Sequence, residues 1–198
     1  MERFLLRGLR MFKSVSGFLS ILSLTLVSVL TAPGVQGAET IGKSAPRVET
    51  KQGSLEGVWV DASKVFRGIP YAKPPIEGLR WQPPQPVDPW SGAQPAKTFG
   101  PACPQPVRFN YMIPDNQAPN EDCLTINVSA PAEAKDQPVW VMIHGGGFVS
   151  GSGEYLLGLG PLLNAEGIVF VSFNYRLSTL GFFAHPELAG EQGVNYGL

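Results

Sequence analysis

The stretch WVMIHGGGF, residues 140–148, is the most informative part of this sequence. A strand-like apolar run leads through His144 directly into three consecutive glycines. Residues without a side chain at the end of a strand allow unusual backbone dihedral angles and let N–H groups face outward. The motif therefore predicts a strand followed by a loop that can present backbone N–H donors to a ligand.

Such a loop can serve three purposes. Acyl transfer needs preorganised N–H donors where negative charge develops on the tetrahedral intermediate, and an HGGG-type motif after a strand supplies them in lipases and esterases. A phosphate cradle is disfavoured, because no Gly-Lys-Ser/Thr ending follows and Ser150 occupies the third-glycine position of a dinucleotide fingerprint starting at Gly145. A plain tight turn stays open on this motif alone, although the flanking His144 and Phe148 favour the oxyanion interpretation.

The surrounding pattern predicts an α/β fold. Apolar runs rich in Val, Ile and Phe indicate buried strands at 124–128, 138–143 and 168–173, and a helix is expected at 155–166. Strand, helix and strand at this spacing form the βαβ unit of a parallel sheet. Earlier strand candidates lie at 47–50, 55–60 and 64–69. Most of the 19 prolines fall between residues 70 and 119, which predicts an irregular loop region packed on a core.

The N-terminus has the features of an export signal. Basic residues from Arg3 to Lys13 precede an uncharged run at 14–30, and small residues follow, so cleavage is expected between Gly37 and Ala38. An uncleaved anchor is the alternative, but the run contains several serines and is short for a membrane span. Residues 1–37 are therefore interpreted as a signal peptide and residues 38–198 as a partial domain, secreted or periplasmic, with no stable membrane span after cleavage.

Charge and cysteine content restrict the remaining possibilities. The formal net charge is −1 and no basic stripe follows the signal, which argues against a nucleic-acid partner. The two cysteines, Cys103 and Cys123, suggest one disulfide in an oxidising compartment, with two free buried thiols as the alternative.

Several longer motifs closely resemble type B carboxylesterases, the cholinesterase-like α/β-hydrolases, in the family's order: VFRGIPYAKPP (65–75), LRW (79–81), EDCLTINV (121–128), HGGGF (144–148), NYRL (174–177), LGF (180–182) and NYGL (195–198). The resemblance implies a small N-terminal antiparallel sheet, then strands of a mostly parallel central sheet with flanking helices, here incomplete. It also implies a serine esterase that acts on small-molecule carboxylic esters through an acyl-enzyme and requires no metal or organic cofactor.

Site residues follow from the resemblance position by position. It implies that Gly146 and Gly147 supply two oxyanion-hole N–H groups and that Cys103 and Cys123 form the family's first disulfide. It further implies that Arg80 and Glu121 form a largely buried ion pair that braces the loop region.

The sequence also departs from the family pattern. No G-x-S-x-G nucleophile elbow occurs in residues 1–198, and the acid and histidine partners follow the serine in hydrolase chain order. His144 belongs to the glycine motif and His185 to a surface turn, so neither is expected to act as general base. We therefore expect these residues alone to be catalytically incompetent, with the 168–173 strand exposed and prone to aggregation. A non-catalytic cholinesterase-like adhesion or binding protein is the alternative, which the intact HGGGF motif disfavours.

Overall fold

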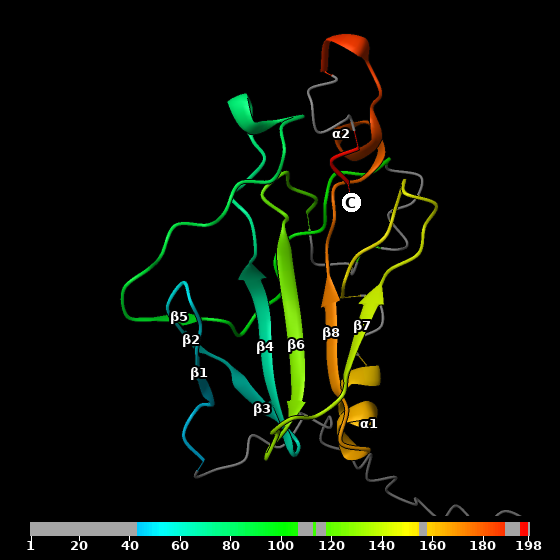
Figure 1. The fold of residues 1–198 in the computed structure, drawn as a ribbon. Coiled ribbons are helices and arrows are strands. Elements are labelled where there is room, and N and C mark those ends of the chain that lie inside the picture. Colours follow the sequence, from blue (N-terminus) through cyan, green and yellow to red (C-terminus); the bar gives the residue numbers. More distant parts are fainter. Residues whose placement is uncertain (1–42, 107–112, 114–117, 155–157, 189–194, 198) are drawn as a thin grey trace, which may run out of the picture. The chain divides into compact units, whose positions relative to one another are not determined.

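The computed structural model describes residues 43–106, 113, 118–154, 158–188 and 195–197 (Figure 1). The predicted signal peptide and its cleavage site lie outside these residues. Within the described ranges, no helix is both long enough and apolar enough to cross a membrane.

The small N-terminal sheet is mixed rather than antiparallel. Strand β2 (Ser54–Glu56) pairs antiparallel with β1 (Arg47–Glu49) and parallel with β5 (Ala93–Pro95). The strand predicted at 55–60 divides at Gly57, where an added Cβ would lie 2.4 Å from the carbonyl oxygen of Val65. That close backbone approach separates β2 from the next strand, which belongs to a different sheet.

The main sheet has five strands in the order β3-β4-β6-β8-β7 (Figure 1). Its first three pairs are antiparallel, and the β7–β8 pair is parallel, as the predicted βαβ unit requires. The sheet described here is therefore mixed, with its parallel part at the end that carries the glycine motif. The strands are β3 (Val58–Val60), β4 (Ser63–Pro70), β6 (Thr125–Pro131), β7 (Val139–Ile143) and β8 (Val169–Phe173).

Helix α1 (Leu159–Ala165) connects β7 to β8 and packs against β6 and β8. It ends where the sequence predicts, because Gly167 adopts a φ of 75° and donates its N–H to the Asn164 carbonyl, while Ile168 donates to Leu163. These two bonds form the Schellman motif that satisfies the last carbonyls of a helix. The Asn164 side chain also donates to Ser129 Oγ of β6 at 2.9 Å, which fixes the helix on the sheet.

Four short elements are absent from the sequence-based prediction. They are strand β5 in the proline-rich region, the one-turn helix α2 (Ser178–Phe182) and the 3₁₀ turns η1 (Glu77–Leu79) and η3 (Pro186–Leu188). The proline-rich region is otherwise irregular, as expected, and side chains at several points join it to the body of the fold. Tyr71 Oη donates to the Asn174 carbonyl at 2.6 Å, and Trp90 Nε1 donates to the Ser54 carbonyl at 2.9 Å.

The exposed edge of the main sheet is β7, not β8. Strand β8 lies between β6 and β7, and its Phe170 is only 1% exposed. In contrast, Val139, Val141 and Ile143 of β7 are 59%, 52% and 61% exposed. The expectation that the 168–173 strand would be exposed is therefore wrong, because the returning strand of the βαβ unit inserts beside β6. The aggregation-prone edge is β7.

Candidate oxyanion site

The loop that follows β7 adopts backbone conformations that favour glycine. Gly146 has a φ of 120° and Gly147 a φ of 62°, both in the region that L side chains rarely enter. A Cβ at Gly146 would lie 1.9 Å from the carbonyl oxygen of Ser150, whereas a Cβ at Gly147 would meet no atom within 4 Å. The glycine at 146 is therefore required both by dihedral angle and by space.

Hydrogen bonds hold the carbonyl groups of this loop. The Gly145 carbonyl lies 2.9 Å from His144 Nδ1, and the Gly146 carbonyl accepts from the N–H groups of Val149 and Ser150 at 3.1 and 3.2 Å. The Ser150 hydroxyl also reaches the Gly146 carbonyl, at 3.3 Å. Hydrogen bonds from within residues 144–150 therefore fix both carbonyls.

Fixing these carbonyls also orients the two expected donors. In a planar trans peptide the C=O and the following N–H point in opposite directions. The N–H groups of Gly146 and Gly147 therefore point away from the hydrogen bonds that hold the loop. Among the described residues neither N–H has a hydrogen-bond acceptor, and Gly147 is exposed. Two adjacent unpaired donors can stabilise an oxyanion.

His144 lies beneath the loop and is only 6% exposed. Its ring stacks on Tyr175 with centroids 4.3 Å apart, and Tyr175 Oη donates to the His144 carbonyl at 2.9 Å. Because a carbonyl oxygen only accepts, the Nδ1 atom facing Gly145 carries a proton. Burial lowers the pKa of His144, while the hydrogen bond to Gly145 opposes that shift. With its Nδ1–H bonded to the Gly145 carbonyl and its ring stacked on Tyr175, the buried imidazole orients the loop.

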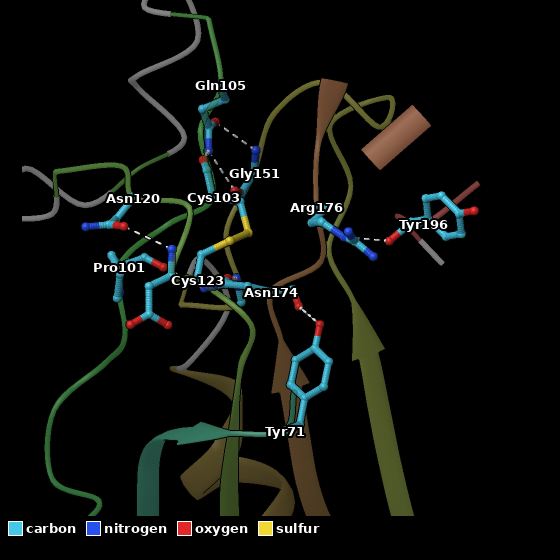
Figure 2. Close-up of a disulfide and its surroundings, with 12 residues drawn as sticks. Tyr71, Pro101, Cys103, Gln105, Asn120, Cys123, Gly151, Asn174, Arg176 and Tyr196 are labelled. Carbon is cyan, nitrogen blue, oxygen red and sulfur yellow. Dashed lines mark hydrogen bonds between the residues drawn. A yellow bond between two sulfur atoms is a disulfide. The ribbon is translucent and has the colours of Figure 1, made fainter. Parts of the chain in front are cut away.

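The disulfide lies next to the loop. Cys103 and Cys123 are bonded with a Cα–Cα distance of 5.1 Å, and each is 1% exposed, so the predicted pairing is present. Two residues after Cys103, the side chain of Gln105 hydrogen-bonds to Gly151 at the end of the glycine loop (Figure 2). The disulfide segment and the glycine loop are therefore directly connected.

Asn174, directly after β8, joins three segments around the disulfide (Figure 2). Its Oδ1 accepts the Gly153 N–H at 2.8 Å, and its Nδ2 donates to the Pro101 carbonyl at 3.0 Å. Its carbonyl accepts the hydroxyl of Tyr71. One buried amide thus fixes the segment after the glycine loop against the chain before Cys103.

A sequence profile of the carboxylesterase family matches residues 44–198. The chain belongs to the carboxylesterase family. It is 40% identical over 157 residues to fumonisin B1 esterase of Sphingopyxis macrogoltabida, a match that covers 75% of this chain and 28% of the relative. It is 39% identical over 156 residues to para-nitrobenzyl esterase of Bacillus subtilis strain 168, covering 76% and 32%.

Solved esterase structures share the fold of this carboxylesterase-family chain. A PNB esterase structure superposes with a TM-score of 0.70 at 33% identity and covers 78% of this chain and 32% of its own. The Geobacillus stearothermophilus carboxylesterase EST55 at pH 6.8 gives a TM-score of 0.64 at 36% identity, covering 76% and 31%. The α/β-hydrolase assignment therefore holds, and the chain spans between 28% and 32% of the length of these four relatives.

The predicted ion pair forms but is less shielded than expected. Arg80 Nε and Nη2 contact the two carboxylate oxygens of Glu121 at 2.7 and 2.5 Å. The side chains keep 39% and 24% of their exposure, so the pair is only partly buried. Both partners lie in irregular segments, Arg80 directly after η1 and Glu121 two residues before Cys123, and not within a sheet.

The second histidine of the sequence, His185, contacts neighbouring residues of its own segment. His185 is exposed, stacks on Phe183 and accepts the Glu187 N–H at its Nδ1 atom. Within the described part of the chain, no cluster of three or more His, Cys, Asp or Glu side chains could hold a metal ion.

Sequence reasoning missed the residues that support the loop from other elements. Gln105 and Tyr175 contact the glycine loop from distant parts of the chain, and no local pattern encodes those contacts. The available signal for Tyr175 was its position two residues after a buried strand, beside the expected end of the preceding parallel strand.

Proposed function

We propose that the complete protein hydrolyses small-molecule carboxylic esters through a serine acyl-enzyme, with the N–H groups of Gly146 and Gly147 binding the oxyanion. The observation that carries this proposal is a pair of adjacent backbone N–H groups that have no hydrogen-bond acceptor among the described residues, in peptides whose carbonyls are hydrogen-bonded within the loop. Family membership and the named esterase relatives support the same chemistry.

The reaction would proceed in two acyl-transfer steps. A serine oxygen forms a bond to the ester carbonyl carbon, and the C=O electron pair moves onto the carbonyl oxygen. The Gly146 and Gly147 N–H groups donate to that oxygen. As the intermediate collapses, the C=O bond re-forms, the ester C–O bond breaks, and the proton taken from the serine hydroxyl passes to the departing oxygen, which leaves as the neutral alcohol. Water then attacks the acyl-enzyme in the same way and releases the acid. Loss of one such donor typically costs about 10²–10³ in kcat.

The nucleophile does not lie within residues 1–198. No G-x-S-x-G pattern occurs there, so the serine, its base and its acid would come from polypeptide beyond these residues. Residues 38–198 then contribute the first strands of the hydrolase domain, the disulfide loop and part of the oxyanion hole.

Export is the second part of the proposal. Residues 1–37 would act as a cleaved signal peptide, which would deliver the domain to an oxidising compartment. The disulfide between Cys103 and Cys123 supports this assignment, because such bonds persist mainly outside the reducing cytosol. Sequencing the N-terminus of the exported protein tests it, with Ala38 expected as the first residue.

The activity is tested with two proteins: the complete gene product, and residues 38–198 alone. With a short-chain nitrophenyl ester, the complete protein should turn over and show a burst of nitrophenol as the acyl-enzyme accumulates. The shorter form should be inactive. Comparable turnover by residues 38–198 would show that the nucleophile lies within them. Ligand binding without turnover by the complete protein would favour an adhesion or binding role.

A further inference from the structure

The carboxamide of Gln105 pairs with both backbone groups of Gly151 (Figure 2). Gln105 Oε1 accepts the Gly151 N–H at 3.0 Å, and Gln105 Nε2 donates to the Gly151 carbonyl at 3.0 Å. The same Nε2 donates to the carbonyl of Cys103 at 3.1 Å. One side chain therefore fixes the end of the glycine loop to the segment that the disulfide holds.

Gly151 in turn packs against the hydrogen bond that orients the Gly145–Gly146 peptide. It is buried and has a φ of 124°. A Cβ at this position would lie 2.2 Å from His144 Nδ1 and 2.5 Å from the Gly145 carbonyl oxygen. With no side chain at Gly151, its backbone lies directly against both atoms of that bond, and a shift of Gly151 would displace them.

We propose that Gln105 is a positioning residue for the oxyanion hole. Its two hydrogen bonds to Gly151 keep that residue packed against the His144–Gly145 contact, which orients the peptide of the Gly146 N–H. The inference rests on the proposed esterase function and adds to it a residue that never touches the substrate. The chain of contacts runs from the disulfide segment through Gln105 to Gly151, and from Gly151 to the peptide that carries the Gly146 N–H.

The carboxamide is chemically suited to this role. A primary amide offers a donor and an acceptor in one plane, so it can pair with an N–H and a C=O of the same residue. A carboxylate keeps the acceptor but loses both donors, and it would place negative charge against the Gly151 and Cys103 carbonyls. Methionine keeps the length of the side chain and loses all three hydrogen bonds.

The test uses the complete gene product with the variants Gln105→Glu and Gln105→Met. Gln85→Glu is the matched control, because Gln85 is exposed and donates one bond, to the Pro83 carbonyl. Both Gln105 variants should lower kcat by about 10- to 100-fold, the scale expected when a catalytic group is misplaced by about 1 Å. KM should change little, and affinity for a trifluoromethyl ketone analogue should fall in parallel with kcat.

Three results would overturn the positioning role of Gln105. Equal loss of kcat in Gln85→Glu, or a kcat loss that only matches the folded fraction measured by circular dichroism, would overturn the positioning role. Unchanged kcat in a folded Gln105→Met protein would also overturn it. Absence of ester hydrolysis by the unmodified protein would instead overturn the proposed function, and this inference with it.

Discussion

Replacing each of the three glycines of the motif by alanine should lower the free energy of unfolding by a different amount. At Gly146 the φ of 120° lies in a region reserved for glycine, which costs about 1–3 kcal/mol. Relieving the 1.9 Å approach of the new Cβ to the Ser150 carbonyl adds about 1–3 kcal/mol of overpacking. The Gly146→Ala change should therefore lower the free energy of unfolding by about 2–6 kcal/mol.

The neighbouring glycines serve as controls. Gly147→Ala places its Cβ in open space at a φ of 62°, so only the left-handed backbone costs, about 1–2 kcal/mol. Gly145→Ala meets no atom within 4 Å, and the residue is not among those with positive φ, so its effect should stay within about 1 kcal/mol.

Urea denaturation followed by circular dichroism measures all three variants of the complete gene product. The expected order of destabilisation is Gly146, then Gly147, then Gly145. Equal stability of the Gly146→Ala and Gly145→Ala proteins would refute the loop conformation on which the oxyanion assignment depends.

Three further outcomes follow from the same structure. Replacing Cys103 and Cys123 together by serine should cost about 3 kcal/mol, because the bridge closes a loop with a sequence separation of 20; an unchanged urea midpoint under oxidising conditions would argue against the bond. A double-mutant cycle of Arg80→Ala and Glu121→Ala should give a small coupling energy that weakens as salt is added, since both side chains remain partly exposed, whereas a coupling that salt leaves unchanged would indicate a fully buried pair. Burial lowers the pKa of His144 from 6.5 in the folded state, so the unfolded chain binds the proton more readily and stability should fall as pH drops below about 6.5. The His144→Asn protein should lack that component of the pH dependence, and identical pH profiles of thermal unfolding would contradict the assignment.

Much of the fold could be predicted from local pattern. The β7–α1–β8 unit follows from two apolar runs separated by a helix that ends at Gly167, because such runs need cover on both faces. The glycine loop after β7 is equally predictable from local sequence, because three consecutive glycines after an apolar run indicate the end of a strand and a loop. The pairing of Cys103 with Cys123 came from residue count, compartment and family position together.

The rest depends on tertiary contacts that sequence spacing does not record. The break at Gly57 coincides with the close approach of the Val65 carbonyl; a glycine inside a strand pattern signals such an approach, but the sequence does not show which strand makes it. The order of β8 and β7 in the sheet, and hence which strand is exposed, is set by where the crossover returns. The role of Gln105 arises because the disulfide brings it beside Gly151, 46 residues further along the chain.

A crystal structure of the complete protein with a trifluoromethyl ketone bound would show whether the Gly146 and Gly147 N–H groups bind the oxyanion. The ketone forms a tetrahedral adduct whose oxygen stands in for the ester oxyanion. We expect this oxygen to lie about 2.7–3.1 Å from both backbone nitrogens. An adduct whose oxygen is bound by other groups, with the two glycine N–H groups facing away, would refute the oxyanion role of Gly146 and Gly147.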